Sequence, residues 1–220
     1  MKAVILAGGI GTRLRPVTYE IPKPLITVKK KPIVNYLIDL FVRHGIQDIG
    51  LLIHKDHIDE YDWWKIRYGK YLEGIRVNIF IEPVASGTFG GLRHVRNWLG
   101  DESFFVSNGD EIKDFDLEAL AKFHNSKEAT ATLALVKVLE PQYYGVPILE
   151  NDKIIQFLEK PRVPPSSFIN SGLYLFDSSI HKYDENNNEF LMSEQYLFPK
   201  LASEGKLFGY KFIDSKWYDC

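Results

Sequence analysis

The sequence has little cysteine, no long hydrophobic run and almost no net charge, and each shortage excludes a class of protein. Its one cysteine, Cys220, is the last residue, so the chain can form neither an internal disulfide bond nor a cysteine-based zinc site. No stretch approaches the roughly 20 apolar residues that span a bilayer. The net charge of −2 is unlike the broad positive field of nucleic-acid-binding proteins. We therefore expect a soluble cytoplasmic protein that binds neither membranes nor nucleic acids.

What remains is the composition of an ordinary globular domain. The 220 residues are 45% hydrophobic and 25% charged, and this length suits one well-filled core. The opening apolar run, within MKAVILAGG, is too short for a signal peptide and ends in glycines. Internal repeats and low-complexity segments are also lacking. The sequence predicts a single domain over residues 1–220.

Short apolar strands alternate with helical patterns over the first half. Apolar runs predict strands at 3–6, 49–53, 77–81 and 104–107, and helical spacing predicts helices at 32–44 and 90–99. Residues 56–74 stay unassigned, although their aromatic residues have helical spacing. This alternation favours an α/β fold, a Rossmann-like three-layer arrangement with a mixed, mostly parallel central sheet.

The second half is patterned differently. It predicts helices at 117–123 and 193–204, a long strand at 129–138, and a final strand at 206–214. Strand-like segments at 144–150, 153–159 and 169–176 are separated by turn residues and prolines. We expect them to form a mixed or antiparallel extension of the sheet that shapes one wall of a cleft. The asparagine run 186–188 is expected to be a surface loop.

The loop after the first strand, LAGGIGTRLRPVTYEIPKPLITV (6–28), combines three glycines with several cations. Glycine lets backbone N–H groups approach a ligand closely, and the cations indicate an anion. A Walker A loop is excluded because Gly11 is followed by Thr12-Arg13. A dinucleotide fingerprint is excluded because Leu14 stands where its third glycine belongs. Prolines prevent a regular helix, so an extended loop would present Arg13 and Lys23 in fixed directions, as a triphosphate requires.

The stretch GGIGTRLRPVTYEIPKPL (8–25) resembles the signature of the sugar-phosphate nucleotidylyltransferases, which join a nucleoside triphosphate to a sugar 1-phosphate. The resemblance continues in the family's order through NGD at 108–110, EKP at 159–161, NSGLY at 170–174 and WYD at 217–219. It implies a nucleotide-binding part at about 1–115 and a sugar-phosphate-binding part at about 116–220. The sequence looks most like the mannose- and heptose-1-phosphate guanylyltransferases.

This resemblance implies a catalytic set of Arg13, Lys23 and Asp110. Arg13 would stabilise the departing pyrophosphate, and Lys23 the charge that builds around the α-phosphorus. Asp110 follows a predicted strand at its carboxyl end, where open α/β sheets bind ligands. The family places a second metal carboxylate at Asp219, and Mg²⁺ prefers such hard oxygen ligands. Two nearby acidic residues are alternative ligands: Glu111 and Asp114.

The resemblance also assigns the binding residues. Nucleotide contacts fall on Leu6, Ala7, Gly8, Gly9, Gly11, Thr12, Arg13, Lys23, Glu82, Gly87, Thr88, Asn108 and Gly109. Sugar-phosphate contacts fall on Gly145, Glu159, Lys160, Asn170 and Gly172. Lys160 would meet the sugar phosphate and Glu159 a sugar hydroxyl.

The implied reaction is in-line attack of the sugar phosphate on the α-phosphorus, which needs no side-chain nucleophile. Glu82 stands where thymidylyl members often carry Gln, and a carboxylate can accept from two N–H groups of guanine, which favours GTP. Against the guanylyl pattern, Ala85-Ser86 replaces the common Pro-Leu, so transfer from dTTP or UTP remains an alternative.

Three rival readings remain. One is a non-catalytic sugar-nucleotide-binding protein. The second is a glycosyltransferase using Asp114-Phe-Asp116, which we instead expect to begin a helix. The third is a molybdopterin guanylyltransferase, whose first loop usually lacks the PKP at 22–24. His54-x-x-His57 and the cations Lys29–Lys31 are expected to lie in solvated surface turns.

The implied partners are a nucleoside triphosphate and a sugar 1-phosphate, and assembly into a homo-oligomer stays open. Relatives ordinarily continue past WYD into a glycine turn and a helix, whereas this sequence ends at Cys220.

Overall fold

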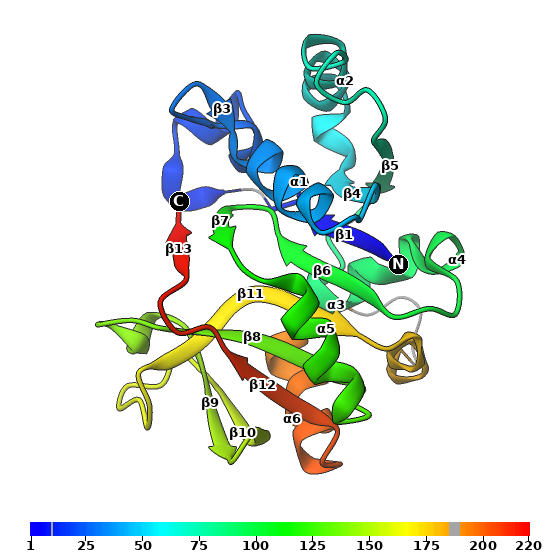
Figure 1. Cartoon of the computed structure of the whole chain (residues 1–220). Coiled ribbons are helices and arrows are strands. Elements are labelled where there is room, and N and C mark those ends of the chain that lie inside the picture. The colour runs from blue at the N-terminus through cyan, green and yellow to red at the C-terminus, as the bar shows by residue number, and fades with distance from the viewer. Residues whose placement is uncertain (10, 185–189) are drawn as a thin grey trace.

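The computed structural model describes residues 1–9, 11–184 and 190–220, without the side chain of Arg13. The asparagine run at 186–188, expected to be a surface loop, lies outside these residues. A nine-stranded sheet with strand order β5-β4-β1-β6-β11-β8-β12-β10-β9 runs through the described chain (Figure 1). The predicted α/β fold with a mixed sheet is confirmed.

The first half supplies the parallel side of the sheet. β1 (Lys2–Leu6), β4 (Asp48–His54), β5 (Arg76–Glu82) and β6 (Phe104–Asn108) pair in parallel. Between them lie α1 (Ile33–Arg43), η4 (Lys55–His57) and α2 (Ile58–Arg67). The apolar stripe of α1 is buried, as its spacing predicted. The unassigned segment 56–74 contains α2, which buries Tyr61 and Trp64.

The second half continues the sheet from β6. β11 (Phe168–Phe176) pairs antiparallel with β6 and with β8 (Ala131–Lys137), and β12 (Leu207–Lys211) runs parallel to β8. β10 (Lys153–Glu159) and β9 (Gly145–Glu150) complete the antiparallel edge. The predicted antiparallel extension is thus present.

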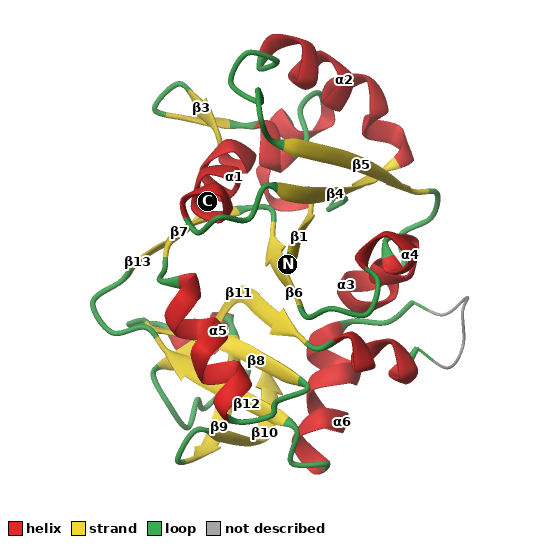
Figure 2. Cartoon of the chain, turned by 45° about the vertical axis from the view of Figure 1, so that its right-hand side comes forward, coloured by secondary structure: helices red, strands yellow, loops and turns green. Residues whose placement is uncertain are grey.

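Helices cover both faces of the sheet and enclose two cores (Figure 2). α1, α2 and α5 (Leu117–Ser126) pack on one face. The other face is covered by α3 (Gly87–Gly90), η5 (Gly91–His94), α4 (Arg96–Leu99) and α6 (Phe198–Ser203). Alternate residues of β8 enter opposite cores, because successive strand side chains point to opposite faces. This is the expected three-layer arrangement.

Short elements complete the described chain. The first loop holds three 3₁₀ turns, η1 (Thr12–Leu14), η2 (Val17–Tyr19) and η3 (Lys23–Leu25). Two more strands, β2 (Thr27–Val28) and β3 (Lys31–Pro32), form a ribbon. The remaining turns are η6 (Pro141–Tyr143), η7 (Ser178–Tyr183) and the π-type η8 (Ser193–Leu197), which runs into α6. The helix predicted at 193–204 is therefore confirmed in two pieces.

Two predicted elements differ in the structure. The helix expected at 90–99 is divided among α3, η5 and α4, since Gly90-Gly91 are poor helix formers, although the predicted inward residues Leu92, Val95 and Leu99 are buried. The final strand expected at 206–214 ends at Lys211, and a further strand, β13 (Lys216–Asp219), pairs with β7 (Glu111–Asp114). The sequence prediction missed both strands of this ribbon.

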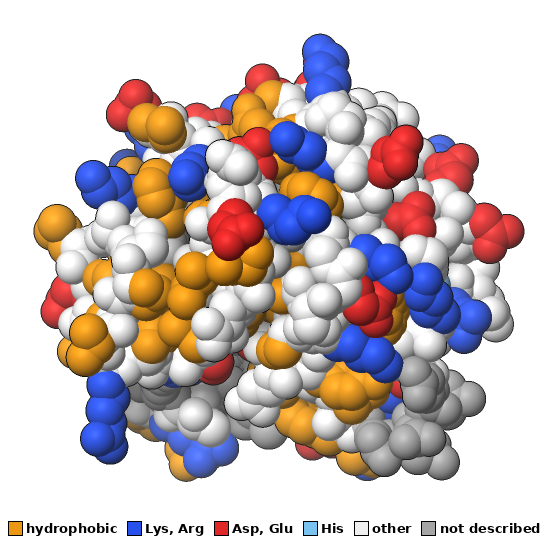
Figure 3. Space-filling view, turned by 90° about the horizontal axis from the view of Figure 1, so that it is seen from below, with side chains coloured by type: hydrophobic (Ala, Val, Ile, Leu, Met, Phe, Trp, Pro, Cys, Tyr) orange, Lys and Arg blue, Asp and Glu red, His pale blue; other side chains and the backbone are white. Residues whose placement is uncertain are grey.

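The surface carries both signs of charge. Viewed from below, Lys, Arg, Asp and Glu are interspersed with hydrophobic side chains (Figure 3). None of the helices in the described ranges is both long and apolar enough to cross a bilayer.

Candidate active site

Lys23 links the two aspartates that the sequence predicted as metal ligands. Its Nζ lies 2.8 Å from Asp110 Oδ2 and 3.9 Å from Asp219 Oδ1. Lys23 is partly buried in η3, and each aspartate keeps 39% of its side chain exposed. A flexible cation on a fixed turn, next to two solvent-accessible carboxylates, can act on phosphate oxygens.

The backbone between β6 and β7 brings Asp110 to the first loop. Gly109 donates its N–H to the carbonyl of Leu6 (2.9 Å), and a Cβ at Gly109 would stand 2.6 Å from that oxygen. Glycine is therefore required by the close approach of two backbones. From the other side, Cys220 N–H donates to Asp110 O (3.2 Å), and β13 places Asp219 opposite Glu111. In Figure 1, β13 ends beside the N-terminal loop.

The first loop (residues 6–28), called the glycine loop from here on, turns sharply at Gly11, whose φ of 62° favours glycine. Thr18 Oγ1 donates to the Gly11 carbonyl (2.7 Å) and fixes this turn. Gly9 is exposed, and a Cβ added to it would meet no atom within 4 Å, so its backbone is open to a ligand. Thr12 is exposed beside it. The predicted role of Arg13 depends on a side chain outside the described part of the chain.

The two acidic alternatives have other partners. Glu111 is buried, lies 2.8 Å from Lys113 Nζ and accepts from the indole of Trp217 (3.2 Å). Burial raises the pKa of Glu111, although the Lys113 ammonium opposes this shift. Asp114 points elsewhere and pairs with Arg43 at 3.0 Å. We therefore retain Asp110 and Asp219 as the candidate metal ligands.

Asp114 and Asp116 also separate in structure. Asp114 ends β7, while Asp116 caps α5 by accepting the N–H of Ala119 (3.0 Å). The expected helix start is confirmed for Asp116 only. Lys31 likewise departs from the expected solvated turn, because it pairs with Asp39 and lies over the ring of Tyr36. Burial lowers the pKa of Lys31, and Arg43 adds to the effect.

Two of the predicted sugar-phosphate residues, Asn170 and Gly172, lie where β11 passes β6 and β7. Gly172, with φ of 64°, passes so close to Glu111 and Asn108 that a Cβ would lie 2.5 Å from each side chain. Asn170 accepts the Gly172 N–H (3.1 Å) and donates to the hydroxyl of Tyr174 (2.9 Å). The sequence-predicted Asn108, Asn170 and Gly172 are thus brought together.

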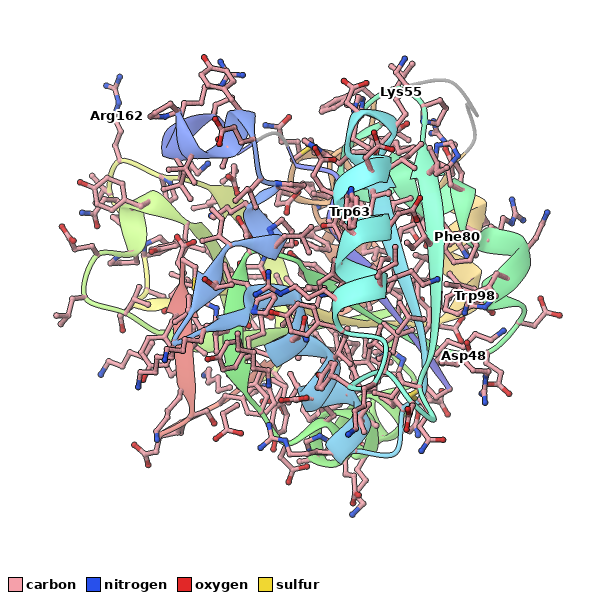
Figure 4. All side chains as sticks on the ribbon, turned by 90° about the horizontal axis from the view of Figure 1, so that it is seen from above. Asp48, Lys55, Trp63, Phe80, Trp98 and Arg162 are labelled. Atoms are coloured by element: carbon pink, nitrogen blue, oxygen red, sulfur yellow. The ribbon has the colours of Figure 1, made fainter. Side chains whose placement is uncertain are left out.

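The Glu159-Lys160 pair stands at the end of β10. Lys160 Nζ is 3.3 Å from Glu159 Oε1, and half of the Lys160 side chain is exposed. A Cβ at Gly145 would come 2.4 Å from the ring of Phe157 and 3.1 Å from Glu159 Oε2, so Gly145 makes room first for the Phe157 ring and then for Glu159. Arg162, two residues further on, points outward (Figure 4).

The predicted base-reading residues lie beside the glycine loop. Glu82 is buried at the end of β5; its Oε1 accepts the Ser86 N–H (2.7 Å), and its Oε2 would be 3.1 Å from a Cβ on Gly8. Gly87 has φ of 85°, and a Cβ there would lie 2.4 Å from the Leu191 carbonyl oxygen. Nearby, the ring of Phe80 in β5 packs 5.1 Å from that of Trp98 in α4 at the sheet edge (Figure 4).

Comparisons with known proteins identify the family of this chain. Residues 2–220 match the nucleotidyl transferase family. The chain belongs to that family. Relatives include the zebrafish (Danio rerio) mannose-1-phosphate guanylyltransferase catalytic subunit beta, 35% identical over all of this chain and 61% of that protein. A Synechocystis UTP–glucose-1-phosphate uridylyltransferase is also 35% identical, over 100% of this chain and 60% of its own length.

A solved structure extends the comparison with the family. HddC from Yersinia pseudotuberculosis, crystallised with GMP-PN, superposes with a TM-score of 0.83 at 25% identity, over 99% of this chain and 92% of that one. The present chain spans about three fifths of the curated relatives named above.

The family resemblance led us to predict Mg²⁺, and the residues fit it. Two carboxylates converge within 4 Å of one ammonium nitrogen, and Mg²⁺ usually takes one or two carboxylates together with substrate phosphates. Among the described residues, no three His, Cys, Asp or Glu side chains are placed to hold a metal ion by themselves. A cation here would therefore share its coordination with substrate oxygens.

The structure adds residues that sequence reasoning missed. Tyr144 donates to Asp219 (3.5 Å), and burial, followed by the nearby Asp219 charge, raises the pKa of Tyr144. The Trp217 indole donates a hydrogen bond to Glu111, and Glu194 accepts one from Thr88. The sequence did carry a signal for two of these residues, because Tyr144 precedes the predicted sugar contact Gly145 and Trp217 belongs to the WYD motif. Glu194 stood only at the start of a predicted helix.

Proposed function

We propose that this chain transfers the nucleoside monophosphate of a nucleoside triphosphate, with GTP favoured, to a sugar 1-phosphate of mannose or heptose type. The observation that carries this proposal is the position of Lys23 between Asp110 and Asp219, beside the glycine loop. Family membership and the guanylyltransferase relative support it.

In the proposed reaction, an oxygen of the sugar phosphate forms a bond to the α-phosphorus, and the bond from that phosphorus to the bridging oxygen breaks. Pyrophosphate leaves with those electrons, so no side-chain nucleophile is required. Lys23 would neutralise charge on the phosphorus centre, and Lys160 would hold the sugar phosphate. Asp110 and Asp219 would hold Mg²⁺, which supplies neutralisation of phosphate charge when bound.

The choice of base rests on Glu82 and on the relatives. The sequence predicted that Glu82 accepts N–H groups of guanine. In the structure, one of its oxygens already accepts the Ser86 N–H, so the carboxylate also stabilises the turn that follows it. The uridylyltransferase relative, equally identical to this chain, favours UTP as the second candidate.

The test is a panel that pairs GTP, UTP, dTTP and ATP with mannose, heptose and glucose 1-phosphates in the presence of Mg²⁺, with pyrophosphate release as the readout. We expect the fastest release with GTP and a mannose- or heptose-type phosphate. Release confined to UTP would replace the guanylyl assignment. Nucleotide binding without release for any pair would instead identify a binding protein.

A further inference from the structure

The turn predicted to read the base is fastened to a distant segment of the chain. We call Ser86–Gly90 the base turn and Leu191–Glu194 the clasp. Leu191 donates its N–H to Ser86 O (2.8 Å) and accepts from both Phe89 N–H and Gly90 N–H (3.0 Å each). The missing side chain of Gly87 makes room for this backbone contact. The shape of the base turn is therefore set by the clasp.

Thr88 and Glu194 complete the connection with side chains. The Thr88 hydroxyl donates to Glu194 Oε2 (2.8 Å) and accepts the N–H of Ser193 (2.8 Å). A hydroxyl has a single proton to donate, and here that proton is used inside the protein. Thr88 is thus poorly suited to the direct nucleotide contact that the sequence predicted.

Glu194 also interacts electrostatically with residues outside the base turn. The charges of Glu159 and Lys160 act on it, and its own charge acts on the buried Tyr174. Burial raises the pKa of Glu194, while its own backbone N–H and the Thr88 hydroxyl oppose that shift. One carboxylate therefore touches the base turn and lies within electrostatic reach of the predicted sugar-phosphate residues.

We propose that Thr88 and Glu194 are positioning residues, which hold the base turn in its binding shape without touching the nucleotide. The inference rests on the proposed function, because it takes the base turn as part of the nucleotide site. A hydrogen bond to a charged group is among the stronger ones in proteins, so its loss is expected to weaken nucleotide binding about 10- to 100-fold.

The experiment measures nucleotide affinity directly, by titration calorimetry of the full chain with Mg²⁺ and whichever of the four triphosphates binds tightest. Thr88→Val removes the hydroxyl at nearly constant volume and is expected to raise Kd about 10- to 100-fold. Thr88→Ser keeps the hydroxyl and is expected to stay within about threefold of the unsubstituted chain. Unchanged binding by Thr88→Val, or equal weakening by both variants, would overturn the proposal.

A second pair approaches the same bond from its acceptor and covers the case in which Thr88→Val does not fold. Glu194→Ala is expected to weaken binding like Thr88→Val. Glu194→Gln keeps an oxygen that can accept the hydrogen bond from Thr88 but loses the negative charge. Its Kd should therefore lie between the Kd of Glu194→Ala and that of the unsubstituted chain. Equal affinities for Ala and Gln would contradict the role of that acceptor. Because binding is measured without sugar phosphate, absent turnover would count against the proposed function alone.

Discussion

Lys23 is the residue at which the candidate active site comes together. Family motifs predicted the importance of this lysine and of Asp110 and Asp219, but not that one ammonium would contact both carboxylates. That contact depends on how the last strand folds back beside β7, which no local pattern encodes. Residue types could be predicted here, whereas residue partners could not.

Glu111 shows the same limit. Considered alone, it was a reasonable alternative metal ligand, because it follows Asp110. In the structure, residues 111 and 113 lie on one side of β7, since strand side chains alternate, and Lys113 neutralises the buried carboxylate. Because β7 was not predicted from the sequence, the ion pair between Glu111 and Lys113 could not be predicted either.

Replacing Lys23 with alanine is expected to reduce turnover at least about 100-fold, because it removes the charge that we propose acts on the phosphates. The fold should persist: the ion pairs of Lys23 are partly exposed, and such pairs contribute about 0–1 kcal/mol. Pyrophosphate release and urea unfolding measure the two effects. Lys70→Ala, at an exposed lysine outside the site, is the control and should change neither. Comparable turnover by the Lys23→Ala and Lys70→Ala variants would show that Lys23 has no catalytic role.

At the scale of elements, the long apolar strands and the α1 helix were predictable, whereas the β7–β13 ribbon was not. Each of its strands has four residues and mixed polarity, and the two strands pair across about a hundred residues of chain. Strand preference depends on packing neighbours as much as on residue type, so short polar strands give little signal. This missed ribbon carries both Asp219 and Glu111.

Gly172 tests the packing between β11 and this ribbon. Gly172→Ala combines an unfavourable backbone angle with a Cβ about 2.5 Å from the Glu111 carboxylate. Because that carboxylate is buried and held by Lys113 and Trp217, it cannot move aside freely, and the variant should lose more than about 2 kcal/mol of unfolding free energy. Gly45→Ala is the matched control: its φ is 74°, yet nothing lies within 4 Å of the added carbon, so only about 1 kcal/mol should be lost. Equal losses in urea unfolding would show that the contact is absent.

At the scale of the whole molecule, the alternating first half and the antiparallel second half were both predictable from hydrophobic patterns. The strand order was not, because β11 pairs with β6 rather than with a neighbour in sequence. The division into nucleotide and sugar parts stays a prediction. The fold also buries two histidines, His124 and His181, and their burial makes its stability depend on pH.

Stability should fall as the pH decreases from about 6.5 to about 4. Burial lowers the pKa of both His124 and His181 to about 4, against 6.5 for the ordinary side chain. Between these pH values the two histidines are protonated in the unfolded chain but remain neutral in the folded chain. A decrease in pH therefore favours unfolding. Each histidine should contribute about 2 kcal/mol of the loss at pH 5.

Urea unfolding at pH 7.5 and pH 5 checks this expectation. His124→Asn should lose about 2 kcal/mol less between the two values than the unsubstituted chain. His181→Asn should show the same reduction, because burial lowers the pKa of both histidines alike. An identical pH dependence for His124→Asn would mean that His124 titrates normally in the fold.

The shared strand β6 has a mechanical consequence. Its ladders run to β1 on one side and to β11 on the other, so moving the first half of the sheet away from the second half would break the pairs from Leu173–Ser107 to Phe176–Phe104. We therefore expect no hinge between the two halves of the sheet, so a closing movement around a ligand would be made by loops at the sheet's edge. Under the proposed function, sugars of different size would be distinguished by side chains held on one continuous sheet rather than by two bodies that close on the substrate.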